Sequence, residues 1–180
     1  GTVIVRASQA GNGNYTAATP VDQSFTVSTT VTQSNITYTY TLGVATAAVS
    51  GHSSASGAIT VPSTITVDGA TYNVTSILGS SSFFSGGAGL NGFKGNAYIT
   101  SVTISSGVTS IEPCAFASCI NLASVTLPSS LTSIGQEAFR NCTSLASVTI
   151  PDSVTSFGGG ATFQDCSNLA SATLPSGLTA

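Results

Sequence analysis

The chain has 180 residues, enough for one or two domains, yet it carries only 3 Lys or Arg and 6 Asp or Glu residues. Nucleic-acid binding depends on a patch of several cations, and Arg6, Lys94 and Arg140 stand far apart, so we expect no nucleic-acid partner. Hydrophobic residues make up 41% of the chain and serine and threonine supply 57 more, which disfavours disorder and favours β-structure. No stretch approaches the roughly 18 consecutive apolar residues that cross a bilayer, so we expect no membrane insertion.

Residues 1–28 contain two β-favouring runs, 2–8 and 21–28, joined by a loop rich in Gly and Asn. They resemble the last two strands of the immunoglobulin-like modules of bacterial surface proteins. An isolated hairpin is only marginally stable in water. We therefore expect these strands to pack on the cap described next, on another part of a longer parent chain, or on another copy.

Residues 29–58 are predicted to form a β-hairpin cap and a linker. Ile36, Tyr38 and Tyr40 alternate with threonines, and the chain turns near Leu42-Gly43 into another β-favouring run that ends at residue 49. We interpret this hairpin as a cap on the N-terminal edge of the repeats that follow. His52 lies in a stretch rich in Ser, Gly and Ala, which predicts a solvated loop histidine rather than a catalytic one.

The second half of the chain repeats with a period of about 23 residues. From residue 99 the units begin ITSVTI, LASVTL, LASVTI and LASATL, with steps of 23, 23 and 24 residues. Apolar residues at relative positions 1, 4 and 6 predict one short strand per turn of a leucine-rich coil. Alternation then places Val125 and Leu127 in a shared interior, with Ser124 and Thr126 outside. Because only stacking hides the apolar faces, at least three units are needed for stability.

Other positions of the repeat contribute to the same interior. Leu131 and Ile134 are expected to reach it from the return side of the coil. Cysteines recur at one place in successive coils, about 4.8 Å apart if the strands stack in the usual way, so spacing does not exclude a disulfide. Parallel side chains nonetheless favour small buried thiols over a disulfide or a zinc site, because no histidine lies near them. These cysteines are Cys119, Cys142 and Cys166, and Cys114 lies outside their row.

The pattern LxxVxLPxxLTSIGxxAFxxC resembles the bacterial surface-antigen type of leucine-rich repeat, called BspA-like, over residues 59–180. An irregular first unit occupies 59–96, with inserts at 68–72 and 79–96 that are candidate loops or capping elements. The predicted fold is therefore mainly β: a leucine-rich-repeat solenoid of about 23-residue coils with an N-terminal β-hairpin cap and additional N-terminal strands. The resemblance implies a secreted or cell-surface protein of a kind associated with adhesion.

The sequence offers little for catalysis. His52 has no GxSxG or similar motif to accompany it, and Glu112 and Glu137 occupy different positions of their units, so the repeat does not stack them into one site. The glycine clusters lack the lysine of a phosphate loop and read as turns. We expect no enzyme activity, no metal and no cofactor.

The outward strand face is the remaining candidate site. Its two hydroxyl rows can bind protein backbone or sugars, and they can equally be plain strand surface of high β-propensity. The rows consist of Ser101, Ser124, Ser147 and Ser171, and of Thr103, Thr126, Thr149 and Thr173.

Three functions follow from these features. The first is a non-enzymatic extracellular or cell-surface interaction module, adhesin-like, that binds a protein or glycan ligand on a host or neighbouring cell. The alternative is the subunit of an extracellular filament, in which copies assemble head-to-tail through the open solenoid end and the N-terminal strands. Ice or glycan binding by the hydroxyl rows is the weakest of the three, because leucine-rich sheets are generally curved and only four rows of each kind are present.

Overall fold

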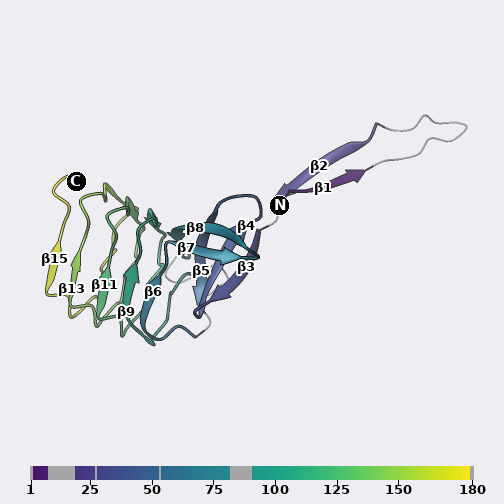
Figure 1. Cartoon of the computed structure of the whole chain (residues 1–180). Coiled ribbons are helices and arrows are strands. Elements are labelled where there is room, and N and C mark those ends of the chain that lie inside the picture. Colours follow the sequence, from purple (N-terminus) through teal and green to yellow (C-terminus); the bar gives the residue numbers. More distant parts are fainter. Residues whose placement is uncertain (1, 8–18, 27, 53, 82–90, 179–180) are drawn as a thin grey trace, which may run out of the picture.

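Figure 1 shows the computed structural model, in which strands stacked into a solenoid follow a β-sheet cap. The structure describes residues 2–7, 19–26, 28–52, 54–81 and 91–178, and strands are the regular elements of these ranges. In chain order they are β1 (Thr2–Ala7), β2 (Val21–Thr26), β3 (Ser28–Gln33), β4 (Ile36–Thr41), β5 (Thr46–His52), β6 (Gly57–Val61), β7 (Thr64–Val67), β8 (Ala70–Ile77), β9 (Ile99–Ile104), β10 (Ser110–Ile111), β11 (Ser124–Thr126), β12 (Ser133–Ile134), β13 (Ser147–Thr149), β14 (Ser156–Phe157) and β15 (Ser171–Thr173).

The N-terminal strands β1 and β2 pair antiparallel, with Thr2 opposite Thr26 and Ala7 opposite Val21. Both predicted strand runs are therefore present, and Figure 1 shows their hairpin extending away from the solenoid. The loop between them falls largely at 8–18, outside the described residues. The likeness of this hairpin to an immunoglobulin-like module stays a prediction.

The predicted cap hairpin is confirmed. β4 and β5 pair antiparallel, and β3 adds a further antiparallel strand on the other side of β4. Alternation in β4 buries Ile36 and Tyr38 at 1% exposure each, while the threonines between them remain half-buried. Tyr40 packs against Tyr72 of β8 with 4.7 Å between ring centroids. The cap therefore presents an apolar face to the first coil.

The irregular first unit has the predicted equivalences. Ile59 of β6 pairs with Val102 of β9, and Ile77 of β8 pairs with Ile111 of β10. The insert at 68–72 is a turn followed by strand: Asp68 and Gly69 have positive φ of 50° and 79° and connect β7 to β8. The insert at 79–96 is only partly described, because residues 82–90 lie outside the described ranges.

The solenoid has a strand side and a return side. On the strand side β6, β9, β11, β13 and β15 follow one another along the axis (Figure 1). On the return side β8, β10, β12 and β14 form one parallel ladder that continues into β5 of the cap. Sequence reasoning predicted the apolar residues of the return side but not its strands, which are only two residues long at β10, β12 and β14.

The interior is filled by identical side chains stacked coil on coil. Leu131 and Ile134 are both fully buried, as predicted. A column of phenylalanine rings runs along the axis with centroid separations of 5.1, 5.1 and 5.5 Å and nearly parallel planes. Regular stacking of this kind requires coils of equal height, so the column fixes the spacing of successive coils at the solenoid's centre. Its members are Phe93, Phe116, Phe139 and Phe163.

The cysteines are free thiols that follow the phenylalanine column. Cys119 Sγ donates to the carbonyl oxygen of Phe93 at 3.1 Å, and Cys142 Sγ donates to that of Phe116 at 3.2 Å. Each thiol thus links its coil to the preceding one, as Cys166 does with Phe139 at 3.1 Å. The predicted row of small thiols is confirmed. Cys114 is also buried, and its Sγ lies 3.5 Å from Glu137 Oε2.

Candidate functional site: the strand face

The hydroxyl rows lie on the outer surface of the strand side, as predicted. Ser124 and Thr126 of β11 are exposed, and so are Ser147 and Thr149 of β13. In β9, Thr103 is exposed and Ser101 half-buried, and in β15 both Ser171 and Thr173 are exposed. The structure brings these side chains onto one face, although they do not form one uninterrupted sheet.

The strand ladder is interrupted between β11 and β13. β11 pairs with β9, and β13 pairs with β15, but no hydrogen-bonded pairing joins β11 to β13. The interruption begins where the chain enters the strands: Ala146 N lies 3.3 Å from Ala123 O. At the equivalent places before and after, Ala123 N lies 2.8 Å from Thr100 O and Ala170 N lies 2.9 Å from Ala146 O. The continuous ladder predicted from the repeat is therefore wrong at this step.

The same two coils remain tightly joined on the return side. β12 pairs with β14, and Gly158 N donates to Ile134 O at 2.8 Å. One coil earlier, Gly135 approaches the backbone of Pro113 so closely that a Cβ there would lie 2.4 Å from Pro113 N. Because the return side is closed while the strand side is open, the two coils diverge as a wedge toward the outer strand face.

The divergence exposes apolar side chains that the repeat elsewhere buries. Val102 and Val148 are only 1% and 3% exposed, whereas the equivalent Val125 is half-buried. Leu127 is likewise half-buried, while its equivalents Ile104 and Ile150 are each 2% exposed. The prediction that Val125 and Leu127 lie wholly inside the core is therefore corrected, because the neighbouring strand does not close over them.

A groove of about 460 Å³ occupies this opening. Its floor is apolar and its rim carries hydroxyl groups. The lining contains neither a charged nor an aromatic side chain, and consists of Ser124, Val125, Thr126, Leu127, Ser129, Ser147, Val148, Thr149 and Pro151. Four of these nine are members of the predicted hydroxyl rows, so the structure concentrates half of the candidate face at one hollow.

A second hollow, of about 330 Å³, lies at the other end of the strand side. It is bordered by Ser34 and Asn35 of the β3–β4 turn and by Ile59 and Thr60 of β6. β6 is the last strand of its three-stranded sheet and pairs only with β9. This hollow marks where the strand face meets the cap.

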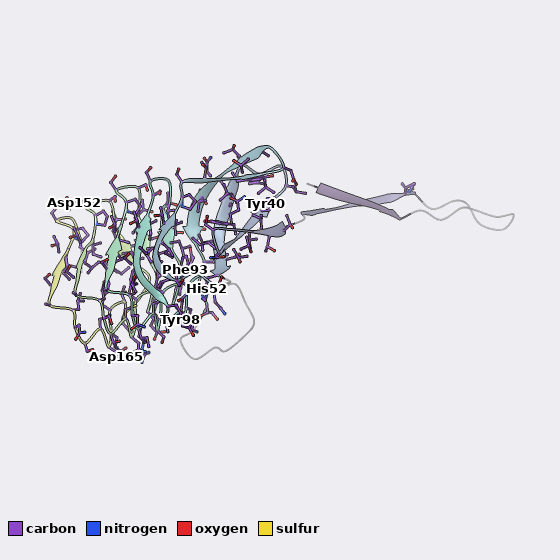
Figure 2. All side chains as sticks on the ribbon, turned by 60° about the horizontal axis from the view of Figure 1, so that its bottom comes forward. Tyr40, His52, Phe93, Tyr98, Asp152 and Asp165 are labelled. Carbon is purple, nitrogen blue, oxygen red and sulfur yellow. The ribbon has the colours of Figure 1, made fainter. Side chains whose placement is uncertain are left out.

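The charged side chains of the solenoid lie away from the groove. Arg140 forms ion pairs with Glu137 at 2.9 Å and with Asp165 at 3.5 Å, and Lys94 Nζ bonds to Ser80 Oγ at 3.0 Å. Figure 2 shows Asp152 and Asp165 on opposite sides of the C-terminal coils. Asp152, next to the groove residue Pro151, accepts hydrogen bonds from the backbone and hydroxyl of Ser176 at 2.9 and 3.2 Å. The groove therefore has little electrostatic field to attract a charged ligand.

The titratable groups are not assembled for catalysis in the described ranges. No group of three His, Cys, Asp or Glu side chains there has the arrangement of a metal site. Burial raises the pKa of Cys119 to about 12 and raises that of Cys142 further, so these thiols are not thiolates near neutral pH. Burial, and then the hydrogen bond with Glu137, also raises the pKa of Cys114.

His52 is not the solvated loop residue that its sequence surroundings predicted. It ends β5, is half-buried, and its ring stacks on Phe93 with a centroid separation of 6.1 Å (Figure 2). Nδ1 lies 3.2 Å from the amide nitrogen of Asn96, which also donates to Ala55 O at 2.9 Å. An amide nitrogen is a donor, so Nδ1 must accept and the ring is neutral. His52 therefore caps the phenylalanine column as a structural residue.

Sequence reasoning missed two features for different reasons. Phe93 lies 23 residues before Phe116 and was obscured by the irregular first unit, although the period itself was a sufficient signal. The groove has no comparable signal, because LASVTL and LASVTI differ by one methyl position and predict identical strands. No helix of the described residues is long and apolar enough to span a membrane.

Comparison with known proteins places the fold in a family. The model of the BspA type leucine rich repeat region matches residues 89–180 in 6 copies. A leucine-rich repeat protein of Bacteroides capillosus is similar in structure, with a TM-score of 0.63 and 25% identity over 80% of this chain and 96% of that one. No curated protein matches the chain.

Two further solved structures extend the likeness. A leucine rich cell surface protein of Faecalibacterium prausnitzii has a TM-score of 0.56 and 26% identity, covering 84% of this chain and 44% of its own. The leucine-rich repeat protein of T. pallidum has a TM-score of 0.59 and 25% identity, covering 81% of this chain and 71% of its own. With the family model matching more than half of its length, this chain belongs to the BspA-type leucine-rich repeat proteins.

Proposed function

We propose that this chain is a non-enzymatic interaction module, displayed outside the cell or on its surface, that binds a partner protein through the outer strand face. The observation that carries the proposal is the groove between β11 and β13, where two apolar side chains that the repeat normally buries are accessible beside four hydroxyl groups. Interfaces gain most of their affinity from anchors that fill such hollows at the centre of a patch.

The surroundings of the groove favour binding over turnover. Its lining contains no group that would serve as nucleophile, base or metal ligand beyond serine and threonine hydroxyls. The one histidine is engaged with Asn96 in the cap region. The surface location is supported by the likeness to the F. prausnitzii cell surface protein at 26% identity. Adhesion is the form of this function that fits a surface-displayed protein face.

The experiment is a binding assay of the purified chain against a panel of extracellular-matrix proteins and bacterial surface proteins. The double variant Thr126→Arg/Thr149→Arg places two long charged side chains on the rim of the groove and is expected to reduce binding at least tenfold. Its matched control, Thr155→Arg/Gln164→Arg, adds the same charges at exposed positions away from the strand face. Binding that survives the first variant, or that both variants reduce equally, would contradict the proposed face.

Glycans and self-assembly are the competing outcomes. A glycan array run with the same variants identifies sugar as the ligand if it alone gives signal. Sedimentation of the purified chain tests the head-to-tail filament, which stays a prediction. A monomer over a wide concentration range would dispose of it.

A further inference from the structure

Resting on the proposed function, we infer that the groove between β11 and β13 is a socket for an uncharged, extended polypeptide segment, which inserts an apolar side chain between the two strands. The floor of the socket is Val125 and Leu127, and its rim consists of the hydroxyls of Ser124, Thr126, Ser147 and Thr149.

The apolar floor identifies the inserted group. Val125 and Leu127 are half-buried here although their equivalents in the adjacent coils are almost completely buried. Covering such surface yields about 25 cal/mol per Å², so an apolar side chain gains from entering the groove. A charged side chain would lose water there without gaining a partner, because none of the lining residues is charged.

The hydroxyl rim identifies an extended main chain beside that anchor. Hydroxyl groups both donate and accept, so the four rim residues can pair with the N–H and C=O groups of a peptide that runs along the groove. The neighbouring edges of β11 and β13 are not paired with each other and leave main-chain groups available at the same place. An extended segment presents alternate side chains to one face, which suits a single apolar anchor flanked by peptide groups.

Spacing excludes full insertion of a strand. Some Cα atoms of β11 and β13 lie within 8 Å of each other. A strand intercalated between them would require roughly 9.6 Å, twice the usual spacing of about 4.8 Å between neighbours. The segment therefore lies over the groove and sends only its side chain in. A glycan fits less well, because it would place hydroxyl groups against the apolar floor and find no aromatic ring in the lining.

The test uses the full chain to select from a phage-displayed library of random linear peptides, followed by binding measurements with synthetic copies of the selected peptides. We expect enrichment of an apolar residue flanked by uncharged residues. Thr149→Glu, on the rim, should weaken binding of these peptides at least tenfold, because it puts a charge beside the inserted side chain. The matched control Thr103→Glu makes the same change in the same row on β9, away from the groove, and should leave binding within twofold.

Several results would overturn the inference. These are recovery of no linear peptide, enrichment of charged peptides, equal effects of Thr103→Glu and Thr149→Glu, or signal on a glycan array alone. Failure here is distinguishable from failure of the proposed function. If a folded protein of the panel binds and is lost with Thr126→Arg/Thr149→Arg while no linear peptide binds, the strand face is an interaction surface but not a peptide socket.

Discussion

Val125 and Val148 occupy the same position of successive coils, yet Val148 is 3% exposed and Val125 is half-buried. The difference arises because β13 pairs with β15 and turns its other edge toward an opening. Two residues that are chemically identical therefore differ in how much water they contact. This asymmetry creates the groove, and it is measurable.

Truncation of the two valines should reveal that asymmetry. Val148→Ala is expected to lower the free energy of unfolding by roughly 2 kcal/mol, since it removes two buried methyl groups and leaves a cavity. Val125→Ala should cost roughly half as much, because the side chain already contacts water in the folded state. Urea unfolding followed by circular dichroism gives both values, and equal losses would mean that the ladder is closed in solution.

Gly135 should be intolerant of any side chain. A Cβ at this position would lie 2.4 Å from Pro113 N, so the tightly packed return side has to move apart. We expect Gly135→Ala to destabilise the chain by roughly 1–3 kcal/mol. Gly160→Ala is the matched control, because nothing lies within 4 Å of its added Cβ, and it should change stability by about 0.5 kcal/mol or less. A silent Gly135→Ala would contradict the close approach of the two coils.

The phenylalanine column should be most sensitive at its centre. Phe139 is fully buried between Phe116 and Phe163, with centroids 5.1 and 5.5 Å away. Phe139→Ala should therefore reduce the free energy of unfolding by about 3–5 kcal/mol. Phe163 is only half-buried, so Phe163→Ala should cost distinctly less. Thermal melts of the two variants check this order, and its reversal would place the core elsewhere.

Stability should fall in mild acid because of His52. Burial lowers its pKa below the ordinary value of 6.5, and a hydrogen bond with the backbone of Lys94 opposes the shift in part. The unfolded chain then takes up a proton before the folded chain does, so stability is greatest above pH 6.5 and declines as the pH falls toward the folded pKa. Protonation also removes the acceptor that Asn96 uses, 3.2 Å away.

Melting temperatures measured from pH 8 to pH 5 test this linkage. The wild-type chain should lose stability below about pH 6.5. In His52→Gln, which cannot titrate, that component of the pH dependence should be absent, even if the variant is less stable throughout. Parallel curves for the two proteins would show that His52 titrates normally.

The thiols should be unreactive until the chain unfolds. Cys114, Cys119 and Cys142 are buried, and burial raises the pKa of each. Cys166 is half-buried and should react first with a maleimide at pH 7, with the other three following only in denaturant. Mass spectrometry of labelled peptides gives the order. Rapid labelling of Cys119 or Cys142 in the folded chain would contradict the thiol row.

The period of about 23 residues was enough to predict the solenoid, the buried positions Leu131 and Ile134, and the outward hydroxyls Ser124 and Thr126. It also identified the cap hairpin around Leu42-Gly43. Each follows from local chemistry, because the alternation of apolar and hydroxyl side chains already states which face of a strand meets water. By the same means Phe93 could have been added to the aromatic column.

Only the tertiary structure decided where the coils separate. Whether β11 pairs with β13 depends on the summed contacts of two whole coils, with close packing at Gly135 and Gly158 on one side and strand pairing with β15 on the other. Those contacts join residues about one turn apart, and the nearly identical letters of the two strands carry no record of them. The repeat by itself determined the kind of surface, whereas packing between turns determined the one place where that surface opens.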